Sequence, residues 1–246
     1  MSDPVISIEH ASKSFGENVV LRDFDLEVAE GETLGILGGS GTGKSVTLKA
    51  MIGLLRLERG RIRFRGRDVT DLKERDWIEV RRHFGMVFQG SALFDSMTVF
   101  ENVAYPLREH TDWDRATIEE RVAEKLALVG LEGIEPQLPA ELSGGMRKRV
   151  GVARAIALDP EIILYDEPTT GLDPANARRI AALIRSLQKR LAVTSVVVTH
   201  DLQLCFEVSD RVGLLKEGHL IVVDDTEAFR SSPAPEVREF LEGAVS

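Results

Sequence analysis

The sequence predicts an α/β fold with a mainly parallel sheet, and three observations support this prediction. Short apolar and β-branched runs are typical of buried strands, and they occur at 5–8, 33–37, 84–88, 161–165, 195–199 and 211–215. Segments with apolar residues at helical spacing separate several of these runs. A glycine-rich loop joins the second run to the helix that follows it. Strands that alternate with helices need crossover connections, and such connections make neighbouring strands parallel.

The helical spacing also predicts how the chain is divided. Helices are predicted at 43–53, 114–129, 143–158 and 174–191, and Pro174 suits the first turn of the last one. Because residues 93–158 lack a convincing central strand, we expect them to form a helical subdomain. The remaining core comprises residues 1–92 and 159–232. Residues 233–246 are expected to form a loose C-terminal tail with a short amphipathic turn.

The charge balance and the cysteine content restrict the partners of the chain. There are 31 Lys and Arg residues against 40 Asp and Glu residues, a formal net charge of −9. Neutralising nucleic-acid phosphates requires a basic face, so we expect no nucleic-acid partner. Cys205 is the only cysteine, which excludes an intrachain disulfide. No apolar run approaches the ~18 residues of a membrane span, so we expect membrane contact only through partners.

Residues 38–45 form a phosphate-binding motif. Their sequence, GGSGTGKS, matches the pattern GxxxxGK[ST] and lies between a predicted strand and a predicted helix. Backbone N–H groups of such a loop cradle phosphates, and the positive end of the helix adds to the attraction. We expect Lys44 to reach the β- and γ-phosphates of a nucleotide and Ser45 to ligate Mg²⁺. The predicted nucleotide-contacting residues are Gly38, Gly39, Ser40, Gly41, Thr42, Gly43, Lys44, Ser45 and Val46.

The segment IILYDE at 162–167 is a second motif, an apolar strand that ends in two acids. Open α/β sheets bind ligands at the carboxyl ends of their strands, which places Asp166 beside the phosphate-binding loop. We expect Asp166 to hold Mg²⁺ directly or through water, and Glu167 to orient and deprotonate the attacking water. The alternative is a polar strand end before Pro168.

The segment LSGGM at 142–146 is a third motif and a second candidate phosphate site. Ser143 can cap the predicted helix, and Gly144 and Gly145 leave its first backbone N–H groups accessible to an anion. A capped helix with a flexible entry explains the same residues equally well.

In their order along the chain, these motifs resemble an ATP-binding cassette, the nucleotide-binding subunit of ABC transporters. The resemblance implies a RecA-like P-loop core with a small antiparallel β portion, a helical subdomain, and ATP hydrolysis with ATP and Mg²⁺ as cofactors. It also implies that Phe15 stacks on adenine, that Gln89 contacts Mg²⁺ and the attacking water, and that His200 contacts the γ-phosphate. Met146 replaces the glutamine that is usual in the family.

The resemblance further implies a head-to-tail dimer. In the family, the counterparts of Ser143, Gly144 and Gly145 in one copy bind the γ-phosphate held by the loop of the other copy. Asp173, in the segment GLDP at 171–174, would then connect the two active sites, although Asp-Pro is also typical of a helix start. ATP would close the dimer and hydrolysis would release it, which would drive a membrane partner between two shapes.

The segment FQGSALFDSMTVFENVAYPLREH at 88–110 is most similar to the ATPase subunit of Mla/Mce-type lipid-transport systems. This similarity implies a permease, an MCE-domain protein and a small STAS-domain protein as partners, with phospholipid as cargo. It implies a location on the cytoplasmic face of the inner membrane. Its apolar residues should line a groove for the permease or belong to the subdomain core; they are Leu93, Phe94, Met97, Val99 and Phe100. Two alternatives stay open: a cytosolic ATPase of iron–sulfur cluster assembly, and the ATPase of a polar-solute importer.

Overall fold

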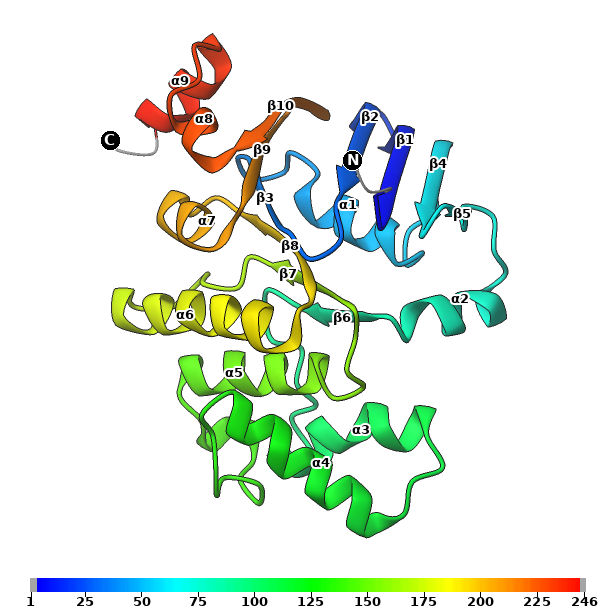
Figure 1. Cartoon of the computed structure of the whole chain (residues 1–246), viewed down its shortest axis with the longest axis vertical. Coiled ribbons are helices and arrows are strands. Elements are labelled where there is room, and N and C mark those ends of the chain that lie inside the picture. Colours follow the sequence, from blue (N-terminus) through cyan, green and yellow to red (C-terminus); the bar gives the residue numbers. More distant parts are fainter. Residues whose placement is uncertain (1–3, 244–246) are drawn as a thin grey trace.

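The computed structural model describes residues 4–243, which form two sheets and the helices packed on them (Figure 1). The strands are β1 (Ile6–Phe15), β2 (Asn18–Val28), β3 (Thr33–Leu37), β4 (Arg59–Phe64), β5 (Arg67–Asp68), β6 (Phe84–Val87), β7 (Ile162–Asp166), β8 (Thr194–Thr199), β9 (Arg211–Lys216) and β10 (His219–Asp225). The helices are α1 (Lys44–Met51), α2 (Glu74–Arg81), α3 (Val99–His110), α4 (Arg115–Leu128), the 3-10 helix η1 (Pro139–Glu141), α5 (Gly144–Ala155), α6 (Pro174–Leu191), α7 (Leu202–Val208), α8 (Thr226–Arg230) and α9 (Pro235–Gly243).

The larger sheet confirms the predicted α/β class. Its strand order is β10-β9-β3-β8-β7-β6, and all neighbours pair in parallel except β10 and β9, which are antiparallel. Parallel strands buried on both faces read as continuous apolar runs, which is why the five parallel strands were predictable. The antiparallel edge strand β10 was not predicted, because none of its residues is fully buried. The smaller sheet, β2-β1-β4-β5, is antiparallel. The sequence analysis missed β2 because its charged residues alternate with buried apolar ones.

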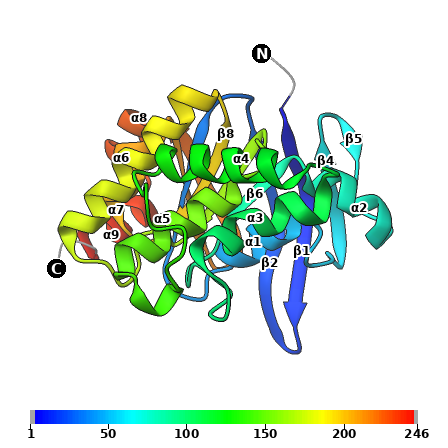
Figure 2. The ribbon, with the colours of Figure 1, turned by 90° about the horizontal axis from the view of Figure 1, so that it is seen from below.

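Helices gather at one end of the molecule, in the green part of Figure 1. Between residues 93 and 158 the structure has α3, α4, η1 and α5 and no strand. Figure 2 shows α3, α4 and α5 lying close together across this end. Helix α3 starts at a capping box, in which Thr98 Oγ1 accepts from Glu101 N at 3.2 Å and Glu101 Oε2 accepts from Thr98 N at 2.8 Å. The boundaries of the subdomain stay a prediction.

The chain near its C-terminus packs more firmly than the sequence analysis predicts. Residues 235–243 form α9 rather than a short turn, and Val237 is fully buried. Phe240 and Leu241 pack on a cluster of buried residues that includes Phe229 and Leu214. The expectation of a loose tail is therefore wrong for α9, because apolar residues at helical spacing give this segment a face to bury. Residues 244–246 lie outside the described part of the chain.

None of the helices in residues 4–243 combines the length and the apolar character needed to span a membrane.

Candidate active site

Two glycines let the loop between β3 and α1 pass close to neighbouring backbone. Gly43 caps α1 with a φ of 108°, in the left-handed region, and a Cβ there would lie 2.9 Å from the carbonyl oxygen of Val20. A Cβ on Gly38 would lie 2.6 Å from the carbonyl oxygen of Leu215. The loop therefore passes close to the backbone of β2 and β9, and a side chain at either position would force it open.

The loop folds around the side chain of Lys44, which is buried. Its Nζ donates hydrogen bonds to the carbonyl oxygens of Gly38 at 2.7 Å and Gly39 at 2.8 Å. The same ammonium lies 3.2 Å from Oε1 of Glu167. The first and second predicted motifs are therefore in direct contact.

Ser45 and Asp166 provide oxygen ligands of the type that Mg²⁺ prefers. Ser45 Oγ donates to Asp166 Oδ1 at 2.7 Å, and Asp166 is buried at the carboxyl end of β7. The pKa of Asp166 lies above its ordinary value. Burial is the main cause and the nearby negative charge of Glu167 adds to it, while the hydrogen bond from Ser45 acts in the opposite direction. A divalent cation would offset the cost of ionising the buried carboxyl of Asp166, so the residues fit Mg²⁺.

The carboxylate of Glu167 is held by several side chains, among them Thr170, whose Oγ1 donates to Oε2 at 3.5 Å. Its Oε2 accepts hydrogen bonds from Nδ1 of His200 at 2.8 Å and from Oγ1 of Thr199 at 3.3 Å, while Oε1 faces Lys44. Burial opposes ionisation, but the hydrogen bond from His200 and the charge of Lys44 outweigh it, so the pKa of Glu167 lies below its ordinary value. A carboxylate that is ionised at neutral pH can accept a proton from water.

Most of the predicted site residues surround one cavity of about 610 Å³. It is lined by Phe15, Val20, Gly39, Ser40, Gly41, Gly43, Lys44, Ser45, Val46, Gln89, Glu167 and His200. Gly38, Thr42 and Asp166 are tied to it through hydrogen bonds with Lys44, Gly39 and Ser45 respectively. The lining thus combines groups suited to binding phosphate and metal and to accepting a proton with an aromatic ring, the combination that a nucleotide requires.

The third motif does not line this cavity in the same copy of the chain. Ser143 caps α5 and its Oγ accepts from Met146 N at 3.3 Å. A Cβ on Gly145 would lie 2.7 Å from Oδ1 of Asn176, so this glycine allows α5 to approach the start of α6. Asp173 caps α6, and its Oδ1 accepts from Asn176 N at 3.0 Å. A Cβ on Gly144 would make only ordinary van der Waals contacts, the nearest at 3.6 Å from Leu172.

Two lysines near the site were not recognised from the sequence. Lys148 in α5 is buried and its Nζ donates to the carbonyl oxygen of Gln89. Lys13 lies over the exposed ring of Phe15, 5.4 Å from its centroid, and so covers one face of that ring. The spacing of three residues from Gly145 through Lys148 to Gly151 places all three on one helix face, which is the signal that could have identified Lys148.

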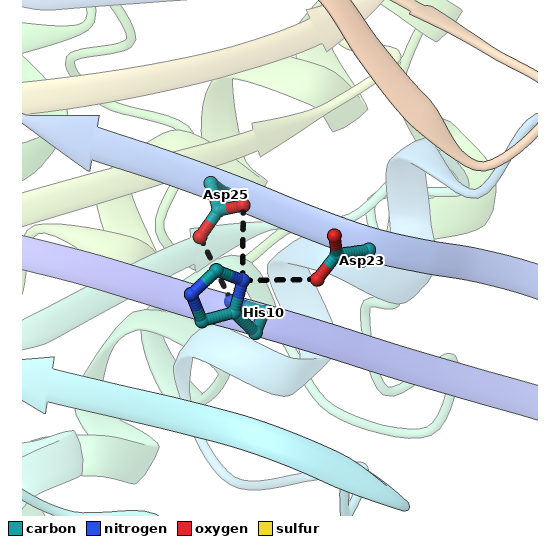
Figure 3. A group of neighbouring side chains, drawn as sticks. All are labelled: His10, Asp23 and Asp25. Carbon is teal, nitrogen blue, oxygen red and sulfur yellow. Dashed lines mark hydrogen bonds and ion pairs between the residues drawn. The ribbon is translucent and has the colours of Figure 1, made fainter.

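A separate group of ligand-type side chains lies on the antiparallel sheet (Figure 3). Nδ1 of His10 is 2.9 Å from Asp23 Oδ1 and 3.6 Å from Asp25 Oδ2, and all three residues are exposed. The register of β1 against β2 shifts between Ile8 and Ala11, and His10 N donates to Asp25 Oδ1 at 2.8 Å instead of to the ladder. This group is explained by the bulge, whose unpaired backbone N–H it satisfies.

The sequence profile of the family described as ABC transporter matches residues 21–170. The chain belongs to the ABC transporter family. It is an ATP-binding ATPase. The ATP-binding cassette MJ0796, solved as a dimer bound to ADP and Pi, matches 90% of this chain with 31% identity and a TM-score of 0.82, and 98% of that structure is covered.

Three relatives of this ABC ATPase carry names that state different functions. A probable ribonucleotide transport ATP-binding protein of Mycobacterium tuberculosis is 45% identical over 97% of this chain, which spans 66% of that protein's length. The intermembrane phospholipid transport ATP-binding protein of Haemophilus influenzae is 39% identical over 99% of this chain and 92% of its own length. The methionine import ATP-binding protein of Symbiobacterium thermophilum is 41% identical over 96% of this chain and 72% of its own length.

Proposed function

We propose that this ABC ATPase drives phospholipid transport between the inner and outer membranes as a subunit of an Mla/Mce-type permease complex. The observation that carries the proposal is the match to the intermembrane phospholipid transport protein, which extends over 99% of this chain and 92% of that relative. The segment 88–110, with the resemblance noted above, supports the same assignment. The proposed partners are a permease, an MCE-domain protein and a STAS-domain protein, at the cytoplasmic face of the inner membrane.

Each group of the cavity has a proposed role in hydrolysis. Lys44 and the backbone N–H groups of the loop bind the phosphates, and Phe15 stacks on adenine with the face that Lys13 leaves uncovered. Glu167 accepts a proton from the attacking water, and His200 orients Glu167 and contacts the γ-phosphate. Ser45 and Asp166, with Gln89, would hold Mg²⁺, which neutralises charge on the phosphate oxygens when bound.

The third motif is proposed to act on the nucleotide of a second copy of the chain. Ser143, Gly144 and Gly145 do not line the cavity of their own copy but form the N-terminal end of α5, the end of a helix that attracts anions. We propose a head-to-tail dimer in which this helix end binds the γ-phosphate held by the partner copy, with Asp173 at the contact. The dimeric state of the similar cassette MJ0796 supports this arrangement.

A second cavity, of about 460 Å³, is the proposed contact with the permease. It lies between the core and the helical region, and Phe88, Phe94, Tyr105 and Pro106 contribute its apolar surface. Phe94 and Tyr105 are exposed, with ring centroids 5.1 Å apart. A permease helix with apolar residues would bury both rings.

Some apolar residues of the segment 93–100 line this cavity, and others pack in the core. Phe94 lines the cavity, whereas Val99 is fully buried and Leu93 and Phe100 pack on the same buried cluster. The core interpretation is therefore confirmed for Val99, Leu93 and Phe100, and the groove for the permease stays a prediction.

Purification from the native host in mild detergent tests the proposal. An affinity-tagged chain should bring down a permease, an MCE-domain protein and phospholipid, identified by mass spectrometry. Phe94→Ala should lose the permease, while Trp113→Ala, which changes an exposed aromatic outside the cavity, should retain it. A cytosolic scaffold without any membrane protein would overturn the transport assignment and favour a role in assembly.

Import of a polar solute is the second candidate function. The observation that favours it is the match to methionine import proteins at 38% and 41% identity over more than 90% of this chain. The same purification separates the two candidates, because an importer would bring down a permease without an MCE-domain protein or enriched phospholipid. The proposed mechanism of ATP hydrolysis is the same for phospholipid transport and for solute import.

A further inference from the structure

One lysine on α5 contacts both halves of the catalytic site through their backbones. Nζ of Lys148 donates to the carbonyl oxygen of Gln89 and lies 3.5 Å from the carbonyl oxygen of Glu167. Gln89 follows β6 and Glu167 follows β7, so the ammonium bridges the ends of two neighbouring strands. Lys148 is therefore linked to the residue proposed to contact Mg²⁺ and to the proposed base without touching either side chain.

The surroundings of Lys148 explain why a buried ammonium is tolerated. The residue is only 6% exposed, and burial lowers its pKa, while the negative charges of Asp166 and Glu167 favour its charged form. An apolar side chain there would leave both carbonyl oxygens without this donor. The position thus combines a donor for the backbone with a positive charge beside two acids.

Helix α5 makes further contacts with residues 89–92, here called the Gln89 segment, beyond the one made by Lys148. Arg154 donates to the carbonyl oxygens of Ser91 at 2.9 Å and Ala92 at 2.8 Å. Ser91 and Ala92 have φ angles of 63° and 48°, in the left-handed region that such residues rarely adopt. Gly151, between the two basic residues, leaves room for Ser91, which would lie 3.4 Å from a Cβ there. One helix face therefore holds a strained segment in place.

We propose that Lys148 is a positioning residue for ATP hydrolysis. It holds the backbones of Gln89 and Glu167 at a fixed separation by hydrogen bonds to their carbonyl oxygens. Because Lys148 lies on the helix that Ser143 caps, it also connects Gln89 and Glu167 to the helix end proposed to bind the partner's nucleotide. The inference rests on the proposed roles of Gln89 and Glu167.

Lys148→Met keeps the length of the side chain and removes its charge and its donors. A misplaced base or metal-contacting residue costs turnover on the order of 10- to 100-fold, whereas the phosphate contacts of Lys44 are untouched. We therefore expect kcat to fall by this factor while the Kd for ATP changes less than about twofold. Lys148→Gln retains an amide donor and should recover part of the lost kcat.

Lys125→Met is the matched control. Lys125 is also a buried lysine, 1% exposed, and its Nζ donates to Asp159 at 2.5 Å and to Glu124 at 3.1 Å, away from the cavity. It should reproduce any general loss of stability without changing kcat. Hydrogen exchange on the purified chain adds a direct readout: Lys148→Met should accelerate exchange in the Gln89 segment, and Lys125→Met should not.

The outcomes separate this inference from the proposed site. Unchanged kcat and unchanged exchange in Lys148→Met would overturn the inference, as would equal losses in Lys148→Met and Lys125→Met. If Glu167→Gln is inactive while Lys148→Met is fully active, the site stands and only the positioning role fails. If Glu167→Gln turns over normally, the proposed base itself is wrong, and exchange then decides whether Lys148 holds the segment.

Discussion

Nζ of Lys44 lies 3.2 Å from Oε1 of Glu167, and both side chains are buried. The proposed phosphate-binding cation and the proposed base therefore neutralise each other in this structure. Phosphates of ATP would compete with Glu167 for Lys44, and this competition would leave the carboxylate free to interact with water. The two groups are thus coupled, and substitutions at each should have different effects.

Lys44→Ala should weaken ATP binding. The lysine contributes charge-assisted hydrogen bonds worth about 1.5–3 kcal/mol, which corresponds to roughly 10- to 100-fold in Kd. Equilibrium binding of a fluorescent ATP analogue measures this change. Lys189→Ala, an exposed lysine on α6, is the control and should bind normally. An unchanged Kd for Lys44→Ala would contradict the assigned phosphate contact.

Glu167→Gln should keep ATP binding and lose hydrolysis. The amide preserves the size of the side chain but cannot accept a proton from water, and general-base catalysis contributes about 10²- to 10⁴-fold. Phosphate release should fall by this factor, and the uncleaved nucleotide should hold the dimer together in light scattering. Near-normal turnover would show that another group is the base.

Ser143→Arg should abolish ATP-driven dimerisation and leave ATP binding to the single chain intact. A large cation at the start of α5 blocks the helix end proposed to face the partner's phosphate. Asp114→Arg is the control, because Asp114 caps α4 in the same way, with Oδ1 accepting from Thr117 N at 2.9 Å. If light scattering finds ATP-dependent dimers for Ser143→Arg, the head-to-tail geometry is wrong.

The sequence predicted the parts of this molecule that depend on short, local patterns. The parallel strands are continuous apolar runs, and the loop at 38–45 has its glycines where β2 and β9 approach it closely. Contacts between distant segments were not accessible in this way. The need for glycine at Gly145 depends on Asn176, and the role of Lys148 depends on a carbonyl 59 residues away. Only the packing of α5 brings these partners together.

His10→Asn should destabilise the protein more at low pH than at high pH. The hydrogen bond with Asp23 and the charge of Asp25 raise the pKa of His10 above 6.5 (Figure 3). Its contribution to stability is therefore complete below 6.5 and is lost as the pH rises through the folded-state pKa. Asparagine tolerates the left-handed φ of 51° at this position.

Urea unfolding at about pH 5.5 and about pH 8.5 measures this dependence. The difference in midpoint between wild type and His10→Asn should be larger at the lower pH. Equal differences would show that protonation of His10 is not linked to folding.

Tyr165→Phe should stabilise the fold. Tyr165 lies in β7 with no exposed surface, and its hydroxyl has no hydrogen-bond partner among the described residues. Burial also raises its pKa, so the hydroxyl stays neutral but desolvated. Removing the oxygen should raise the free energy of unfolding by about 1 kcal/mol, which corresponds to a Tm increase of roughly 2–4 °C for a chain of this size. Tyr105→Phe changes an exposed ring and should leave Tm unchanged. A lower Tm for Tyr165→Phe would show that the buried hydroxyl is hydrogen-bonded in solution, since only the loss of a satisfied group destabilises a core that keeps its shape.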